Sequence, residues 1–194
     1  MECAICEDRD CLKGKDCTGL HDEIIAEYTP EDLRLHVAAS RVVSKYYGEK
    51  TRLEEIALFA RELGVSRIGI ALCSAVSEEA RVVHQYLKKE GFDVRSAMCK
   101  ICGVDKEELG AVRTKPPGEF EPSCNPVGQA KILADEDTEY NISMGLCVGH
   151  DAIFNAKSRV PVTTLVTKDR VLAHNPLGVV YTKYGRVHRL GLKE

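Results

Sequence analysis

The sequence predicts an α/β protein with a mostly parallel sheet in three layers. From residue 67 onward, short apolar runs alternate with longer segments of helical periodicity. The runs are apolar on both faces, which is typical of parallel strands that are covered by helices. We therefore expect a Rossmann-like or flavodoxin-like α/β domain over residues 29–194, preceded by a small cysteine-rich segment over residues 1–28.

Two helices are expected before the first strand. Thr29-Pro30-Glu31-Asp32 opens the first helix, with Thr as cap and Pro in the first turn. Thr51-Arg52-Leu53-Glu54 has the pattern of a capping box and opens the second helix. Apolar residues follow both starts at helical spacing, and Gly48 and Gly64 suit the two helix ends.

The remaining elements follow from the same alternation of patterns. A polar loop rich in Pro and Gly runs through Pro122, and loops of this length in compact domains are usually functional. The expected elements are a strand at Arg67–Cys73, a helix from about Ser77 to Glu90, a strand at Asp93–Cys99, a helix from Asn125-Pro126 to about Ala134, a strand at Asn141–Cys147, a short helix from near Asp151, a strand at Val160–Val166, a turn at Thr167–Arg170 and a short return strand at Val171–Ala173.

Composition narrows the class of protein. Lys and Arg number 27 against 30 Asp and Glu, a near balance that argues against nucleic acid or membrane surfaces as partners. The longest apolar runs fall far short of the roughly 20 residues of a membrane-spanning helix. The N-terminus has neither a basic region nor an apolar signal-peptide core, so we expect a cytoplasmic protein.

Cysteine is the outlier, with nine residues and no export signal, which argues against a disulfide scaffold. Four of them, Cys3, Cys6, Cys11 and Cys17, have the spacing C-x2-C-x4-C-x5-C. Four thiolates in so short a span can bind one Zn²⁺ or a 4Fe-4S cluster. Because compact runs of four cysteines are commoner for clusters, iron-sulfur is preferred and zinc is the alternative. An unmetallated thiol-rich tail is the third possibility.

A second group of cysteines follows the expected strands. Cys73, Cys99 and Cys147 each end a separate strand, and ligands bind at that edge of open parallel sheets. Cys124 precedes the helix start at Asn125-Pro126, where the helix dipole favours a thiolate. The pattern predicts a second metal and cofactor site formed by these four thiols. The alternative is that each cysteine is a small buried hydrophobic residue.

Other polar residues lie near the same edge. His150 and Asp151 follow the third strand, and His174 precedes Asn175-Pro176, where a second Asn-capped helix is expected. These three residues are candidate catalytic groups. Alternatively, Asp151 is only a helix cap and the histidines are ordinary core residues. Lys100, beside Cys99, is either an anion ligand or a surface lysine.

Cys99-Lys100-Ile101-Cys102 raises a rival interpretation, a thiol–disulfide oxidoreductase. That chemistry needs the motif to open a helix, which lowers the pKa of the first thiol. A long loop follows Cys102 instead, beginning at Gly103. Gly-rich phosphate loops and a Ser-His-Asp arrangement are not found in the sequence.

Several segments resemble a prokaryotic family of uncharacterised, cysteine-rich proteins that are thought to bind metal (domain of unknown function 1847). The resemblance spans nearly the whole chain, the N-terminal cysteines included, and implies a metal without supplying a reaction. Cys102 departs from it, since Gly is more usual there. The N-terminal motif is also similar, over fifteen residues, to cluster motifs of carbon monoxide dehydrogenases and hybrid-cluster proteins. The segments that carry the family resemblance are Cys124–Ala130, Gly145–Asp151, Pro161–Val166, Lys168–Leu172 and His174–Pro176.

The leading hypothesis is a cytoplasmic metalloprotein with an N-terminal four-cysteine site and a second thiolate site at the sheet edge. It would be an iron-sulfur enzyme acting on a small molecule, or an electron-transfer protein with a redox partner protein. Two alternatives remain open, a structural zinc protein that presents a surface to a partner and the thiol redox protein.

Overall fold

A computed structural model describes residues 1–193. The strands are β1 (Arg67–Leu72), β2 (Asp93–Met98), β3 (Tyr140–Met144) and β4 (Val162–Val166). The α-helices are α1 (His21–Glu27), α2 (Pro30–Tyr46), α3 (Arg52–Glu62), α4 (Ser77–Lys89), α5 (Pro126–Asp135), α6 (Val148–Lys157) and α7 (Gly178–Tyr181). Short 3-10 turns lie at Cys3–Ile5, Asp10–Lys13, Ser74–Val76, Ile101–Gly103 and Glu107–Leu109, and a π-helical turn lies at Gly185–Arg189.

The four strands form one parallel sheet in the order β2-β1-β3-β4. β1 is central, so that Ile70 lies beside Ser96 of β2 and Ile142 of β3. The chain moves outward from β1 to β2, and then crosses to the other side of β1 to form β3. Such a reversal places the carboxyl ends of β1 and β3 on either side of a crevice where ligands bind in open α/β sheets. The predicted α/β fold with a parallel sheet is confirmed.

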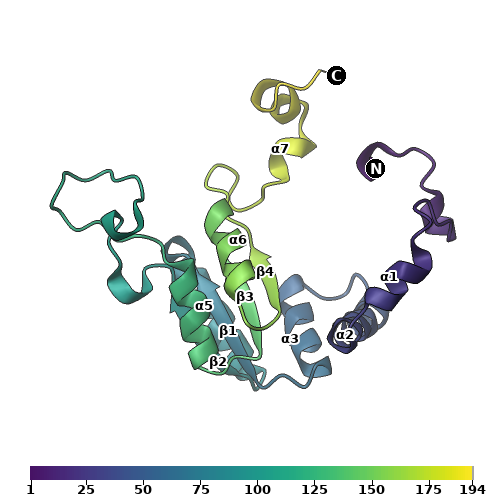
Figure 1. The fold of residues 1–194 in the computed structure, drawn as a ribbon, viewed down its shortest axis with the longest axis horizontal. Coiled ribbons are helices and arrows are strands. Elements are labelled where there is room, and N and C mark those ends of the chain that lie inside the picture. The colour runs from purple at the N-terminus through teal and green to yellow at the C-terminus, as the bar shows by residue number, and fades with distance from the viewer. Residues whose placement is uncertain (194) are drawn as a thin grey trace.

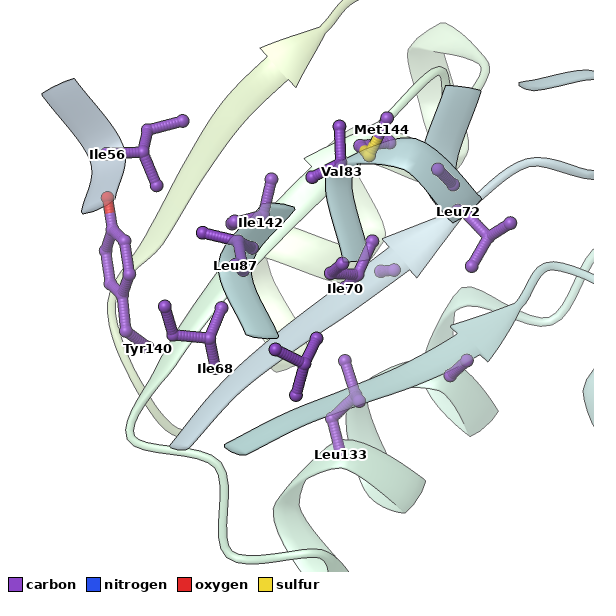
Figure 2. Packing of buried hydrophobic residues seen from close by; sticks show 14 of the residues in the cluster. Ile56, Ile68, Ile70, Leu72, Val83, Leu87, Leu133, Tyr140, Ile142 and Met144 are labelled. Carbon is purple, nitrogen blue, oxygen red and sulfur yellow. The ribbon is translucent and has the colours of Figure 1, made fainter. Parts of the chain in front are cut away.

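Helices cover both faces of the sheet (Figure 1). α5 packs against α6 on one face, and right-handed crossovers place α4 on the other. Arg61 of α3 pairs with Glu90, which follows α4, so α3 and α4 are neighbours. In Figure 2, the core side chains of β1 and β3 lie together with Val83 and Leu87 of α4.

The helix starts read from the sequence are confirmed. Thr29 and Asp32 form a reciprocal capping box at α2, and Thr51 and Glu54 form another at α3. The Asn125 side chain accepts a hydrogen bond from the backbone N–H of Gly128 and caps α5. These signals are local, since each depends on residues within one turn of helix.

The N-terminal part of the chain projects away from the sheet as an arm (Figure 1). None of the side chains up to α1 is buried, and α2 buries only Ala38 and Val42. α1 was not expected from the sequence. It begins after Asp16, whose carboxylate accepts hydrogen bonds from the backbone N–H groups of Thr18, Gly19 and His21.

Three details of the sequence interpretation are wrong near the carboxyl edge. β3 ends at Met144, because Gly145 takes a positive φ of 64°, and Cys147 is the N-cap of α6, which begins at Val148 instead of near Asp151. The return strand expected at Val171–Ala173 is a series of turns.

The physical reason for the missing return strand is a side chain that bonds the local backbone. The Asp169 carboxylate accepts hydrogen bonds from the N–H groups of Val171 and Leu172. Ala173 and His174 then take positive φ values of 49° and 63°, which extended strands do not allow. Asn175 caps no helix, since α7 begins only at Gly178 without a side-chain cap.

The long loop after β2 is held by partly buried ion pairs. Glu121 accepts from the Lys106 ammonium at 2.6 Å and from the backbone N–H groups of Thr114 and Lys115 at 2.8 and 3.0 Å. Asp105 pairs with Arg113 at 2.9 Å. The loop is thus held from inside by its own carboxylates.

In residues 1–193, no helix has the length and apolar character needed to cross a bilayer.

Candidate thiolate site at the sheet edge

The backbone brings three of the four cysteines of the second group together. The N–H of Cys73 donates to the carbonyl of Met144 at the end of β3, at 3.0 Å. The N–H of Cys99 donates to the carbonyl of Leu72 at 2.8 Å, and the Cys99 carbonyl accepts from Asn125, which follows Cys124, at 2.8 Å. Cys73, Cys99 and Cys124 therefore lie at one edge, although they come from three separate segments.

The Cys99 thiol is affected by burial and by the neighbouring thiols. Burial raises the pKa of the Cys99 thiol, and the Cys124 and Cys73 thiolates raise it further. The backbone N–H of Ser74 donates to Cys99 Sγ at 3.4 Å, which opposes this rise. Cys73 and Cys99 are buried, whereas Cys124 is partly exposed.

Two basic side chains lie against the other two thiols. Lys100 Nζ donates to Cys124 Sγ at 3.3 Å and to the carbonyl of Pro122 at 2.8 Å. Arg170 Nη2 donates to Cys147 Sγ at 3.4 Å, and the Cys147 thiolate raises the pKa of Arg170, as Cys73 and Cys124 do more weakly. Cys147, at the N-cap of α6, thus shares one charged environment with the other thiols.

A buried glutamine holds the strand ends that carry the cysteines. Gln129 of α5 is fully buried, and its Nε2 donates to the carbonyls of Leu72 at 3.1 Å and Ala97 at 2.7 Å. Leu72 precedes Cys73, and Ala97 lies two residues before Cys99. Sequence analysis missed this residue, although a glutamine among the apolar residues of a short helix was a usable signal.

Two of the three candidate catalytic residues, Asp151 and His174, have hydrogen-bond partners. Asp151 Oδ1 accepts from the Ser143 hydroxyl of β3 at 2.6 Å, which ties the first turn of α6 to the sheet. His174 Nδ1 accepts from the backbone N–H of Asp169 at 3.1 Å, so this nitrogen helps to shape the turn. His150 is half-buried in the first turn of α6, three residues after Cys147.

Cys102 and the N-terminal cysteines lie in a different setting. Cys102 is exposed in a 3-10 turn, at a positive φ of 69°, while Cys99 of the same C-x-x-C is buried. The motif therefore does not open an α-helix. All four N-terminal cysteines are exposed on the arm: Cys3, Cys6, Cys11 and Cys17.

Each group of thiols is a candidate set of metal ligands. Within residues 1–193, no three His, Cys, Asp or Glu side chains are grouped as ligands of one metal ion. The donor chemistry fits a thiophilic metal in both places, since each group offers four sulfurs and the sheet-edge thiols carry basic neighbours. A closed, tetrahedral single-ion site is not preformed at either place.

The fold and the edge define an α/β protein with cysteines at the carboxyl edge of a parallel sheet. The family model described as "Protein of unknown function (DUF1847)" matches residues 11–165, and the chain belongs to this family. The chain is 42% identical over 186 residues to the uncharacterized protein MJ0455 of Methanocaldococcus jannaschii, which covers 95% of both chains. The family resemblance read from the sequence is confirmed.

Proposed function

We propose that the protein is a thiolate metalloprotein whose functional centre is held by Cys73, Cys99, Cys124 and Cys147. One observation supports the proposal: four cysteines from four separate chain segments lie at the carboxyl edge of the sheet, three of them in segments joined by backbone hydrogen bonds and Cys147 at the start of α6. Buried cysteines that serve only as small hydrophobic residues need no common location. Soft thiolates gathered in this way are typical ligands of zinc or of iron-sulfur clusters.

An iron-sulfur cluster suits the sheet-edge thiols better than zinc. A tetrahedral Zn²⁺ with bonds of about 2.3 Å needs its sulfurs within roughly 4 Å of one another. A cubane cluster binds each thiolate to a different iron, and its ligands are spaced more widely. Because the four cysteines come from four separate chain segments, we prefer the cluster, whose ligands are spaced more widely. Lys100 and Arg170 would donate to its thiolate ligands and offset their negative charge.

The N-terminal cysteines would hold a second centre with a different role. Four thiolates leave no open ligand position, so a metal held by Cys3, Cys6, Cys11 and Cys17 would serve structure or electron transfer. The sheet-edge centre would act on a small molecule or exchange electrons with a partner protein. His150 is the nearest candidate proton donor along the chain, because Asp151 and His174 already have the partners described above.

Metal and sulfide analysis of protein purified without oxygen tests the proposal. We expect iron and acid-labile sulfide in the intact protein, with part lost in Cys147→Ser and another part in Cys6→Ser. Cys102→Ser is the matched control, because this exposed thiol lies outside both groups. Iron retained in full by Cys147→Ser would remove the sheet-edge centre.

The two alternatives give different outcomes of the same experiment. Stoichiometric zinc without sulfide would favour the structural zinc protein. A metal-free protein with a reversible Cys99–Cys102 disulfide would favour the thiol redox protein, although Cys99 is buried. To separate the roles of the two centres, cyanide is titrated against Cys147→Ala, His150→Ala and Cys6→Ala by absorption spectroscopy. A response altered only in Cys6→Ala would make the N-terminal centre the reactive one.

A further inference from the structure

The chain exposes more surface than folded monomers of its mass usually do. Its solvent-accessible surface is 12859 Å². A folded monomer of 21.5 kDa is expected to expose about 9,200 Å². The excess of about 3,700 Å² is several times the roughly 800 Å² that each partner buries in an interface of standard size. Three parts of the chain project from the sheet domain: the N-terminal arm, the loop after β2 and the chain beyond the turn after β4 (Figure 1).

The last of these parts, which we call the C-terminal segment (residues 171–193), is largely without cover. It contains α7 and the π-helical turn, which are joined by a hydrogen bond from Arg186 Nη1 to the carbonyl of Val180 at 3.0 Å. Within the segment, Gly185 alone is buried. Its large apolar side chains are each at least 44% exposed at Val171, Leu177, Val180, Tyr181, Tyr184, Leu190 and Leu192.

A second exposed apolar surface lies on the arm, where α1 meets α2. Ile24 and Tyr28 line a hollow of about 330 Å³ together with the acidic side chains of Glu27 and Asp32. Ile25, beside the hollow, is 61% exposed, and no residue of α1 is buried. The hollow therefore offers apolar and acidic walls to an occupant with apolar and basic side chains.

The C-terminal segment and this part of the arm carry opposite charges. Residues 16–33 contain six Asp and Glu and no Lys or Arg, whereas residues 171–194 contain four Lys and Arg and one acid, Glu194. The three acids of α1 form no ion pair within residues 1–193, and neither do Arg189 and Lys193. Both surfaces thus have charges available for a partner of the opposite sign.

Within one chain these two surfaces lie apart (Figure 1). The turn after β4 sets the direction of the C-terminal segment, because the Asp169 carboxylate accepts from the N–H groups of Val171 and Leu172. The N–H of Asp169 also donates to His174 Nδ1 at 3.1 Å. Closure onto the arm of the same chain would have to change this turn. A second copy presents the same arm without such a change, and a two-fold axis would form the contact twice.

We propose that the protein is a homodimer in which the C-terminal segment of each copy binds the arm of the other copy. The exposed tyrosines and leucines of the segment would cover Ile24 and Tyr28, and Arg189 and Lys193 would face the acids of α1. Apolar and aromatic side chains at the centre with charges at the rim are usual in protein interfaces. The contact uses none of the cysteines, so it is independent of the proposed metal centres.

Sedimentation equilibrium of the full chain, purified without oxygen and kept with a reductant, tests the dimer. The variants are Arg189→Glu in the C-terminal segment, and Glu27→Lys and Ile24→Ser on the arm. All three side chains are exposed, so each variant should fold, which circular dichroism checks. Lys89→Glu is the matched control, because it makes the same charge change as Arg189→Glu at an exposed position in the last turn of α4.

We expect a mass of twice the 21.5 kDa of one chain at micromolar concentrations. Arg189→Glu and Glu27→Lys should each raise the dissociation constant by roughly tenfold or more, since each places like charges together at two symmetric contacts. The double variant Arg189→Glu with Glu27→Lys should recover most of this loss. Ile24→Ser should also weaken the dimer, and Lys89→Glu should stay within about twofold of the intact protein.

Three results would overturn the dimer. The first is a monomer at every concentration. The second is a dimer that Arg189→Glu, Glu27→Lys and Ile24→Ser leave unchanged, which would mean that another surface joins the copies. The third is equal weakening by Lys89→Glu, which would reduce the effect to net charge.

Two further readings of the same experiment separate this dimer from related possibilities. A monomer whose sedimentation coefficient falls in Arg189→Glu would show that the C-terminal segment covers its own arm, and this would overturn the dimer as well. Iron and sulfide content report separately on the proposed function. A monomer that contains iron and sulfide would remove the dimer alone, and a metal-free dimer that responds to the variants as expected would remove the metal centres alone.

Discussion

The two groups of four cysteines offer the same sulfur donor atoms but are held in place in different ways. Cys3, Cys6, Cys11 and Cys17 lie within one short segment, all exposed, with no buried side chain around them. The sheet-edge cysteines come from four distant segments: backbone hydrogen bonds position Cys73, Cys99 and the segment of Cys124, and Cys147 is the N-cap of α6. The first group depends on short sequence spacing and the second on tertiary structure, so disturbances of the metal and of the fold should affect them differently.

The largest expected effect is on the N-terminal segment when metal is removed. Its side chains bury too little apolar surface to order the chain, so its fold should depend on the metal. Trypsin should then cleave after Arg9, Lys13 and Lys15 roughly tenfold faster or more in chelator-treated protein. Arg67, in β1, is the internal control and should stay uncut. Equal protection with and without metal would show that metal does not organise this segment.

The second largest effect is expected when the sheet is destabilised and the metal is left in place. A Cβ at Gly69 of β1 would overlap Oδ1 of Asn141 in β3, so Gly69→Ala should lower the free energy of unfolding by about 1–3 kcal/mol. Urea unfolding measures this loss. The metal proposed at the sheet edge should be released at lower urea than the metal proposed for the N-terminal cysteines. Adding Asn141→Ala to Gly69→Ala should recover part of the stability. Release of both metals at the same urea concentration would contradict the expected difference between the two groups of cysteines.

A matched pair of helix caps gives a smaller effect. Thr51→Ala removes the cap of α3, whose Ile56, Ala57 and Ala60 are in the core, and should cost about 1 kcal/mol of global stability. Thr29→Ala removes the same cap from α2, on the arm. There we expect faster amide exchange at the start of α2 and little change in the unfolding midpoint. Equal shifts of the midpoint would show that the arm unfolds together with the sheet.

The smallest effect concerns the loop beside Cys124 at acid pH. The Lys106 ammonium and the N–H groups of Lys115 and Thr114 hold the pKa of Glu121 well below its ordinary value of 4.5. Its contribution to stability is therefore complete above pH 4.5 and is lost as the pH falls toward the lowered pKa. Amide NMR signals of Thr114 and Lys115 should shift progressively in acid. Glu121→Gln should loosen the loop at neutral pH and make the amide signals less dependent on pH. An acid response that is unchanged in Glu121→Gln would refute this role of Glu121.

The sequence predicted those parts of the molecule that depend on neighbouring residues. The caps at Thr29, Thr51 and Asn125 are local hydrogen-bond patterns, and the positions of Cys73 and Cys99 follow directly from the ends of apolar runs. The family resemblance was also carried by contiguous motifs.

The features that the sequence did not predict depend on backbone conformation and on packing between distant segments. Periodicity gave no sign that Gly145 would end β3 early and move Cys147 to a helix cap. The turn after β4 was identified, but the burial of Lys168 results from tertiary packing that no local pattern reports. Two basic residues directly after a parallel strand were the available signal for this part of the site.

The all-parallel order of the sheet has a consequence for the timing of assembly. No two neighbouring strands are joined by a hairpin, and each pairing closes a long loop before any contact stabilises it. During synthesis, the first four cysteines leave the ribosome before any strand exists. The sheet-edge thiols meet only after β3 has joined β1, late in folding. Under the proposed function, the arm would take up its metal on a nascent chain, whereas the sheet edge would take up its metal only in a nearly finished protein.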